Sequence, residues 1–288
     1  MFFRERLKKY TCVLCPHECS IAPGGVGFCR SRGVPPEGEG NERSVVSLTY
    51  GKVTSVALDP VEKKPLYHFH PGSGILSVGS FGCNLRCTWC QNHSISMAGG
   101  SDANTQSVSP QTLAALAEKY LPDGNIGVAF TYNEPLINYE FVRDTSKLLQ
   151  ERSLKSVIVT NGYINPGRFE ELTPLIDAMN IDLKSINNDF YAKIKGDLEI
   201  VKQNIRTAAK SCHVEITCLL IDGENDSEDE MERMAEFIAS VSPEIPLHIS
   251  RFFPRFLMKD REPTSIDNMK RFEEIAQKKL THVHLGNV

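Results

Sequence analysis

From Ile75 onward the chain alternates short apolar runs with longer amphipathic runs, and this alternation restricts the folds open to it. The apolar runs have the length of buried strands, and the amphipathic runs have helical spacing. The predicted strands are Ile75–Ser80, Ile126–Thr131, Ser156–Thr160, Ala178–Leu183, His213–Leu220 and Leu247–Phe252. The predicted helices are Pro110–Tyr120, Leu136–Gln150, Pro166–Leu175, Glu199–Ser211, Ser227–Ser240 and Ser265–Lys279. Such strand–helix units predict an α/β protein with a parallel sheet, either a (β/α) barrel or an open doubly wound sheet.

Polar residues follow successive predicted strands, and their order favours the barrel. Asn133 and Glu134 follow the second strand, Asn161 the third and Lys184 the fourth. In a barrel, functional side chains collect at the carboxyl ends of several strands. We therefore predict a partial or complete barrel of about six units. Ser227 followed by Glu230 also predicts a capping box at the start of one helix.

The chain is long enough for a barrel and a small appendage. It has 288 residues, of which 41% are hydrophobic, and this is sufficient for a substantial core. We predict a cysteine-rich metal-binding module at 1–40, a hairpin and connector at 41–74, and the barrel at 75–288. The hairpin is expected over Val45–Leu58, with its turn at Tyr50–Lys52.

Charge and hydropathy indicate a cytoplasmic protein. The net charge of −4 gives no general attraction to nucleic acid or anionic lipid. No apolar run approaches the roughly 18 to 20 residues that span a bilayer, and the basic segment Met1–Tyr10 is not followed by the apolar run of a signal peptide. In a reducing compartment the nine cysteines are expected to be metal ligands or buried thiols, and Cys212 and Cys218 are expected in the core.

Three cysteines lie close together directly after the first predicted strand. Cys83, Cys87 and Cys90 have C-x3-C-x2-C spacing, which offers three thiolates to a four-iron cluster and leaves one iron open to a ligand. A closed structural zinc site normally takes four ligands, so a group of three argues against zinc. Trp89 adds an aromatic face beside the last cysteine.

This spacing, with an aromatic residue before the last cysteine, resembles the radical S-adenosylmethionine (SAM) superfamily. The resemblance implies a partial (β/α)6-type barrel, a 4Fe-4S cluster and SAM as cofactors. It implies an oxidoreductase-type activity in which SAM is cleaved reductively to a 5′-deoxyadenosyl radical, which abstracts hydrogen from a substrate. The electron would come from a donor such as flavodoxin or ferredoxin.

The resemblance also indicates residues that would hold the cofactor. Thr131–Pro135 stands where many members have Gly-Gly-Glu-Pro, so Glu134 is the candidate for the SAM ammonium group, with Asn133 beside it. The positions resembling cofactor contacts of the glycyl-radical-enzyme activases are Asn161, Asp182 and Lys184. Lys184 would pair with the cofactor carboxylate and Asp182 would orient it.

Each of these residues also has a structural alternative. Asn161 begins an ordinary Asn-Gly turn signal, Glu134 before a proline can begin a helix, and Lys184 can end a strand in solvent. Trp89 and His248 complete the predicted cofactor-binding set, and His68, His70, His248 and Arg251 are the polar residues placed next to the site.

Longer segments are similar to one branch, the AmmeMemoRadiSam-system radical SAM enzymes, which are relatives of pyruvate formate-lyase activating enzyme. These segments are Asp59–Phe69, Cys90–Asn92, Tyr132–Pro135, His248–Pro254 and Gly286–Val288. Members often continue past the final Gly-Asn-Val into a cysteine-containing tail, so the chain is expected to be a short member or a piece of a longer protein.

A second cysteine set near the amino terminus predicts a closed metal site. Cys12, Cys15, Cys19 and Cys29 supply four thiolates, which suit tetrahedral zinc or an auxiliary 4Fe-4S cluster. The Cys12-x2-Cys15-Pro16 spacing resembles a rubredoxin-type knuckle and favours zinc, whereas a cluster would relay electrons. His17 is an alternative ligand.

Three functions remain open from the sequence. The first is hydrogen abstraction from a protein or peptide, as in glycyl-radical activases. The second is radical modification of a small molecule or RNA. The third is a non-catalytic, metal-stabilised binding protein, which would form no 5′-deoxyadenosine.

Overall fold

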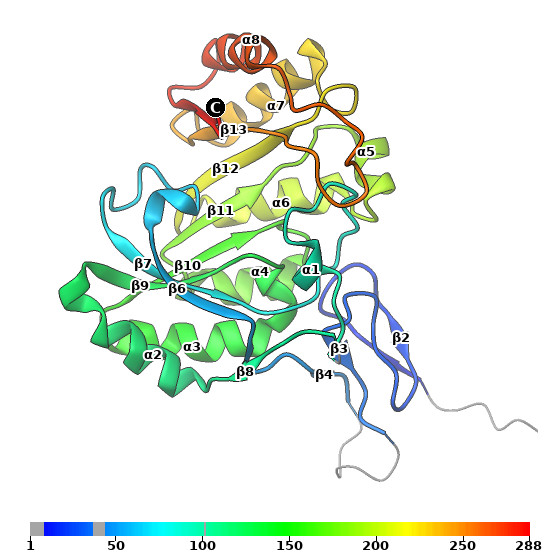
Figure 1. Cartoon of the computed structure of the whole chain (residues 1–288), viewed down its shortest axis with the longest axis vertical. Coiled ribbons are helices and arrows are strands. Elements are labelled where there is room, and N and C mark those ends of the chain that lie inside the picture. Colours follow the sequence, from blue (N-terminus) through cyan, green and yellow to red (C-terminus); the bar gives the residue numbers. More distant parts are fainter. Residues whose placement is uncertain (1–8, 37–43, 101) are drawn as a thin grey trace, which may run out of the picture.

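The computed structural model describes residues 9–36, 44–100 and 102–288. Within these residues the central feature is an eight-stranded sheet with the order β14-β13-β12-β11-β10-β9-β7-β6 (Figure 1). In this sheet β6 is antiparallel to β7. The remaining strands, β7, β9, β10, β11, β12, β13 and β14, are parallel to one another. Their bounds are β6 (Ser55–Pro60), β7 (Gly74–Gly79), β9 (Asn125–Phe130), β10 (Lys155–Thr160), β11 (Ala178–Asp182), β12 (His213–Leu220), β13 (Leu247–Arg251) and β14 (Val283–Gly286).

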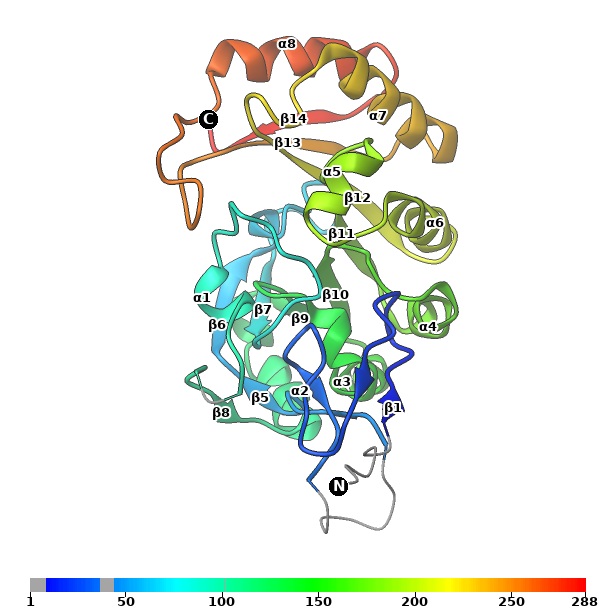
Figure 2. The ribbon, with the colours of Figure 1, turned by 90° about the vertical axis from the view of Figure 1, so that its right-hand side faces the viewer.

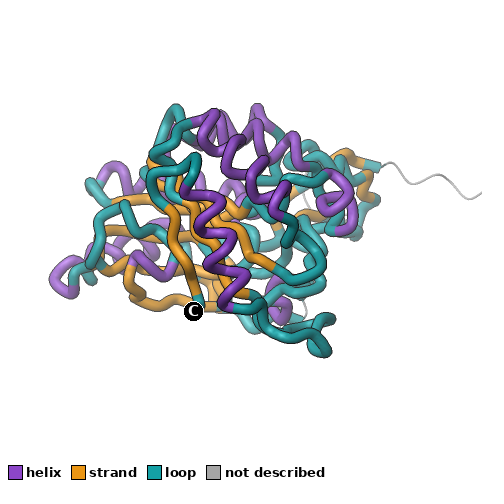
Figure 3. The backbone as a smooth tube through the Cα atoms, turned by 90° about the horizontal axis from the view of Figure 1, so that it is seen from above, coloured by secondary structure: helices purple, strands orange, loops and turns teal. Residues whose placement is uncertain are grey.

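Helices connect the parallel strands and lie on the outside of the sheet. The longer ones are α2 (Pro110–Lys119), α3 (Tyr139–Glu151), α4 (Pro166–Leu172), α6 (Leu198–Ala208), α7 (Glu228–Val241) and α8 (Ile266–Gln277). Shorter helices are α1 (His93–Ser96), α5 (Asn188–Lys193), η1 (Val61–Lys63), η2 (Leu121–Asp123), η3 (Pro135–Asn138) and η4 (Thr173–Leu175). Figure 2 shows α4, α6 and α7 in a row along one side of the sheet, and Figure 3 shows a helix of the outer layer lying over the strands near the carboxyl terminus.

This arrangement confirms the predicted α/β class and the partial barrel. Six helical crossovers join the parallel strands within the described residues, and β14 at one edge of the sheet is not paired with β6 at the other. The barrel is therefore open on one side.

The helix ends follow local side-chain chemistry. Ser109 and Ser265 accept hydrogen bonds from the backbone N–H three residues ahead, as N-caps do. Ser227 accepts from the Glu230 N–H at 3.2 Å, which is one half of the predicted capping box. The other half is absent, because the buried Glu230 carboxylate instead accepts from Ser185 and from the Ile186 N–H.

The hairpin predicted over Val45–Leu58 is wrong. The turn forms, with Lys52 N–H donating to the Thr49 carbonyl at 2.9 Å and Gly51 at a φ of 69°. However, β4 (Val46–Ser47) pairs with β3 (Arg32–Gly33), and β5 (Lys52–Val53) pairs with β8 (Gln106–Ser107). The two strands beside the turn therefore do not pair with each other. Each pairs with a strand from elsewhere in the sequence.

The cysteine-rich segment near the amino terminus has little regular structure. β1 (Tyr10–Thr11) pairs with β2 (Ser20–Ile21), and Val26 bridges to Gly33. The Asn165 N–H, at the start of α4, donates to the Leu14 carbonyl at 3.0 Å, and Figure 2 shows part of this segment next to α4. Most of the predicted linker at 35–41 lies outside the described residues.

A second core cluster joins four of the parallel strands to the segment that follows β6. It contains Ile75 on β7, Ala129 on β9, Val157 on β10 and Ala178 on β11, together with Val61, Leu66 and Phe69 from the segment that follows β6. This segment, residues 61–69, acts as an internal plug. Among the described residues, no helix is long and apolar enough to cross a membrane.

Candidate active site

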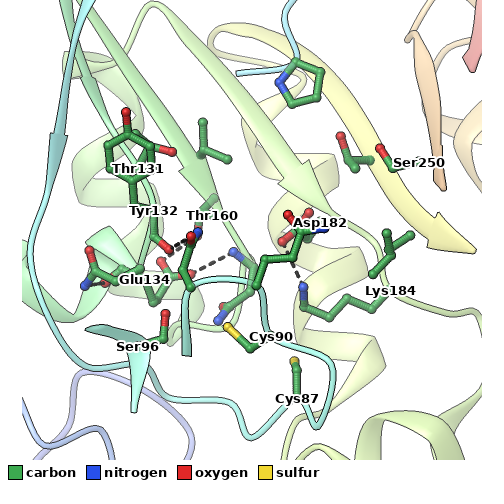
Figure 4. Close-up of a pocket in the computed structure, with 18 of the residues that line it drawn as sticks. Cys87, Cys90, Ser96, Thr131, Tyr132, Glu134, Thr160, Asp182, Lys184 and Ser250 are labelled. Atoms are coloured by element: carbon green, nitrogen blue, oxygen red, sulfur yellow. Dashed lines mark hydrogen bonds and ion pairs between the residues drawn. The ribbon is translucent and has the colours of Figure 1, made fainter. Parts of the chain in front are cut away.

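One cavity of about 570 Å³ lies where the parallel strands end, and it collects the predicted site residues. Figure 4 shows part of its wall, with Cys87 and Cys90 facing Glu134, Asp182 and Lys184. The lining includes every residue predicted for the cluster and cofactor: Cys83, Cys87, Trp89, Cys90, Asn133, Glu134, Asn161, Asp182, Lys184 and His248.

The three cysteines lie on the loop between β7 and α1, called the cluster loop here (residues 80–92). The Cys83 sulfur accepts from the Leu85 N–H at 3.4 Å and from Asn161 Nδ2 at 3.7 Å. Burial, with the Glu134 carboxylate nearby, holds the pKa of the Cys83 thiol well above its usual value, and burial raises that of Cys87 to about 11. Thiols in this setting ionise when a metal replaces the proton.

Trp89 is buried and shields the cavity beside the last cysteine. Its ring lies 5.3 Å from that of Phe190, centroid to centroid, at an angle of 44°. The contact fixes an apolar face next to Cys90.

Glu134 is a buried carboxylate held by three protein donors. Oε1 accepts from Thr160 Oγ1 at 2.7 Å and from the Leu136 N–H at 3.0 Å, and Oε2 accepts from the Asn161 N–H at 2.8 Å. Burial outweighs these bonds and raises the pKa of Glu134 to about 7. Because a carboxylate oxygen has two lone pairs, Oε2 can accept one further donor from the cavity.

Asn133 lines the cavity, and its side chain is bonded to the cluster loop. Its Oδ1 accepts from the Ser80 N–H at 3.0 Å, and its Nδ2 donates to the carbonyls of Phe81 and Gly82. The side chain is therefore engaged in tying the end of β9 to the cluster loop. Tyr132 adopts a φ of 72°, a left-handed conformation suited to glycine.

Asn161 links the cluster loop to the end of β10. Nδ2 donates to Asn84 Oδ1 at 2.9 Å as well as to Cys83, and Oδ1 accepts from the Tyr163 N–H. An N–H donor to a ligating sulfur is a contact that orients the ligand and tunes an iron–sulfur centre.

Asp182 and Lys184 form an ion pair in the cavity wall. Lys184 Nζ lies 2.8 Å from Asp182 Oδ2, and the lysine side chain is 16% exposed. Burial alone would lower the pKa of Lys184, but Asp182 and Cys87 outweigh it, so this pKa lies well above its usual value. The lysine therefore presents a fixed positive charge to the cavity.

His248, on β13, is held by a carboxylate that the sequence did not single out. Its Nε2 lies 2.5 Å from Glu215 Oε2 on β12, and Glu215 also accepts from His213 Nε2 and from the N–H groups of Tyr67 and His68. Glu215 is fully buried.

Three further predicted neighbours of the site do not line the cavity. His68 and His70 are exposed, and His68 Nε2 lies 2.8 Å from His284 Nε2. Arg251 turns to the Thr264 carbonyl, to which its Nε donates at 2.7 Å. His68 and Arg251 thus support the surrounding chain, and alternation along β13 favours His248 and Ser250 as the lining residues.

The amino-terminal cysteines lie close together. Burial raises the pKa of Cys15 to about 12, and the other three cysteines of the set act electrostatically on it. Among the described residues, no three His, Cys, Asp or Glu side chains stand close enough to share one metal ion, either in this set or in the cluster loop, so the second metal site stays a prediction. His17 Nε2 lies 2.7 Å from the Asn84 carbonyl oxygen, so this imidazole bonds to the cluster loop.

Several lining residues were missed. They are Glu62, Lys63, Tyr67, Ser96, Thr131, Thr217, Ser250 and Asn287. Ser250 sits two residues from the predicted His248 on β13, so the period of two could have found it. The residues of the plug carry no comparable local signal.

Comparison with known proteins now assigns the family. Residues 77–238 match the Radical SAM superfamily, and this range is more than half of the chain. The chain belongs to the radical SAM superfamily. It is homologous to pyruvate formate-lyase-activating enzymes, and the homologues point to enzymatic activity.

Three relatives describe the extent of the likeness. An uncharacterised protein of Methanocaldococcus jannaschii is 37% identical over 99% of this chain and 84% of its own. Pyruvate formate-lyase-activating enzyme of Clostridium pasteurianum is 30% identical over 59% of this chain and 72% of its own. Streptococcus suis SuiB, solved with the precursor peptide SuiA, has a TM-score of 0.58 at 14% identity, covering 78% of this chain and 51% of its own. At this low identity, the similarity to SuiB shows a shared fold and nothing more.

Membership of this superfamily implies a 4Fe-4S cluster and SAM. The residues present fit both groups. Three thiols line the cavity with an N–H donor on one sulfur, and a carboxylate with a free lone pair and a fixed cation lie across from them. These complement the ammonium and carboxylate of an amino acid.

Proposed function

We propose that this chain is a radical SAM enzyme of the AmmeMemoRadiSam branch that abstracts hydrogen from a protein or peptide. In this proposal 1–40 is a metal-binding module, 41–74 a connector and 75–288 the catalytic barrel. The proposed setting is the cytoplasm, with an electron donor such as flavodoxin or ferredoxin.

One observation carries the proposal. The thiols of Cys83, Cys87 and Cys90 line the same cavity as Glu134 and the Asp182–Lys184 pair, although these groups come from three segments of the chain. A structural metal site needs thiols alone. The added carboxylate and cation are the groups that an amino-acid cofactor requires.

The bound cluster and SAM would supply an electron and a carbon-centred radical at this site. Cys83, Cys87 and Cys90 would hold the cluster and leave one iron open. Glu134 Oε2 would accept from the ammonium group of SAM, and Lys184, oriented by Asp182, would pair with its carboxylate. Asn161 would hold Cys83 by its N–H···S contact. Trp89 would exclude water beside Cys90, and His248 would contact the cofactor from β13.

A protein or peptide substrate is supported by the homology to activating enzymes. The C. pasteurianum relative is named for activating pyruvate formate-lyase. The barrel is open between β14 and β6, which suits a large substrate. At Cys12, Cys15, Cys19 and Cys29 we propose a second metal, either zinc or an auxiliary 4Fe-4S cluster.

The test is anaerobic reconstitution with iron and sulfide, followed by SAM and dithionite, while 5′-deoxyadenosine is measured. We expect product from the wild type and none above background from Cys87→Ala, because the cluster then lacks one of its three thiolates. Cys212→Ala is the matched control, because this cysteine lies outside the cavity. No product from a wild type with a complete, reducible cluster would contradict the proposal and favour a binding protein.

A further inference from the structure

Arg86 lies within the cluster loop, one residue before Cys87, and is anchored entirely to backbone. Its guanidinium donates to the carbonyls of Cys83 at 2.8 Å and Leu85 at 2.9 Å, and also to the carbonyl of Phe28. The guanidinium carbon lies 3.8 Å from the centre of the Phe28 ring. This arginine therefore joins the cluster loop to the amino-terminal segment.

No carboxylate pairs with Arg86 among the described residues. Its guanidinium donates to the carbonyl of Cys83 in one set and to that of Phe28, the residue before Cys29 of the other, so it lies between the two sets. Arg30 is a second cation that acts on it. A partly buried cation without an anion is costly. The thiolates of a bound cluster at Cys83, Cys87 and Cys90 would supply the missing negative charge.

The two cysteine sets are also in direct contact through backbone. Gly82, with a φ of 83°, packs so closely against Ser31 Oγ and the Cys29 carbonyl that a Cβ would overlap both. The Phe28 N–H donates to the Cys19 sulfur at 3.3 Å. A continuous path thus runs from Cys19 through Phe28 and Arg86 to the Cys83 carbonyl.

We propose that Arg86 is the counter-cation of the cluster held by Cys83, Cys87 and Cys90 and that its charge sets the reduction potential of this cluster. The proposal rests on the proposed function for the existence of that cluster. Reduction adds one electron to a centre that its thiolates already make negative. A nearby cation stabilises the reduced state, so it raises the reduction potential.

The experiment uses the full chain, reconstituted anaerobically, in four forms: wild type, Arg86→Gln, Arg86→Lys and Arg152→Gln. Arg152 is the control, because it also donates to a backbone carbonyl, that of Leu148, but it lies at the end of α3 and not on the cluster loop. Iron, zinc and sulfide per chain are measured first. Each form is then titrated with dithionite and followed by electron paramagnetic resonance, and added SAM identifies the signal of the cluster with the open iron.

We expect Arg86→Gln to shift this cluster to a more negative potential, with Arg86→Lys close to the wild type and Arg152→Gln unchanged. Loss of the cluster from Arg86→Gln alone, restored in Arg86→Lys, would equally show that the charge is required. An unchanged potential in a fully loaded Arg86→Gln protein would overturn the proposal. Loss of the cluster from both Arg86 variants with unaltered helix content would also overturn it. The guanidinium would then be needed for its hydrogen-bonding geometry and not for its charge.

These outcomes are separable from a failure of the proposed function. The titration needs an assembled cluster but no SAM cleavage. A wild type that forms no 5′-deoxyadenosine would contradict the proposed function, and the potential shift would still be measurable.

Discussion

At the scale of the residue, Glu215 shows how a buried charge is compensated. The carboxylate is fully buried, yet it accepts four hydrogen bonds, from His213, His248 and the N–H groups of Tyr67 and His68. Burial alone would raise the pKa of Glu215, but these donors hold it well below its usual value. The side chain thereby joins the plug to β12 and β13.

Glu215→Gln should destabilise the protein by about 3–5 kcal/mol at neutral pH, because it removes the anion on which four donors converge. The folded-state pKa of Glu215 is lowered, so its contribution is complete above the unfolded value of 4.5 and is lost as pH falls below it. The stability difference between wild type and Glu215→Gln, measured by urea unfolding, should therefore shrink below about pH 4.5.

Acid also releases thiolate-bound metal, but from both proteins alike, so only the difference between them reports on Glu215. The exposed Glu170 provides a control, and Glu170→Gln should change stability by less than about 0.5 kcal/mol. A difference that stays constant from pH 6 to pH 4 would argue against an ionised Glu215.

At the scale of the element, the strands could be predicted closely because apolar runs are a local signal. The predicted strand His213–Leu220 has the bounds of β12, and the other five differ from theirs by one residue at one or both ends. β14 was missed because Val283–Gly286 is short and contains a histidine. The pairing of β4 and β5 could not be predicted, because strand partners are chosen by the whole fold.

In the candidate site, too, local features could be predicted from the sequence and contacts between distant residues could not. The thiols could be predicted since a C-x3-C-x2-C pattern is contained in eight residues, Cys83 to Cys90. The contacts of Glu215 with His248 and of Arg86 with Phe28 join residues 33 and 58 positions apart. No periodicity connects such pairs, so only the folded chain reveals them.

Gly82 and Gly124 form a matched pair for testing the junction of the two cysteine sets. Both have left-handed backbone, with φ of 83° and 82°, but a Cβ at Gly124 would meet nothing within 4 Å. Gly124→Ala should cost about 1–2 kcal/mol from backbone strain alone. Gly82→Ala should cost more in urea unfolding and should lower the iron content, because its Cβ would displace Ser31 and Cys29.

Equal effects of the two substitutions would mean that the amino-terminal segment does not press against the cluster loop. Iron content is measured beside stability because it responds to displacement of Cys83, the next residue, even where the fold survives.

At the scale of the whole molecule, the plug closes the barrel at the end away from the cysteines. Val61, Leu66 and Phe69 form one core cluster with residues of β7, β9, β10 and β11, while Pro65 and Tyr67 of the same segment line the cavity. Asn180 of β11 donates to the Pro65 carbonyl at 2.7 Å. One segment thus completes the core on one side and provides a wall of the cavity on the other.

Leu66→Ala should therefore affect both core and cavity. Leu66 is fully buried, and its truncation should destabilise the protein by about 2–5 kcal/mol in urea unfolding, whereas Leu121→Ala, at a half-exposed leucine, should change little. Hydrogen exchange provides the second readout. The Tyr67 and His68 amides donate to Glu215, so they should exchange faster in Leu66→Ala than in the wild type. Lower stability with unchanged exchange at these two amides would mean that the plug stays docked through Glu215, and the core and the cavity wall would then be held independently.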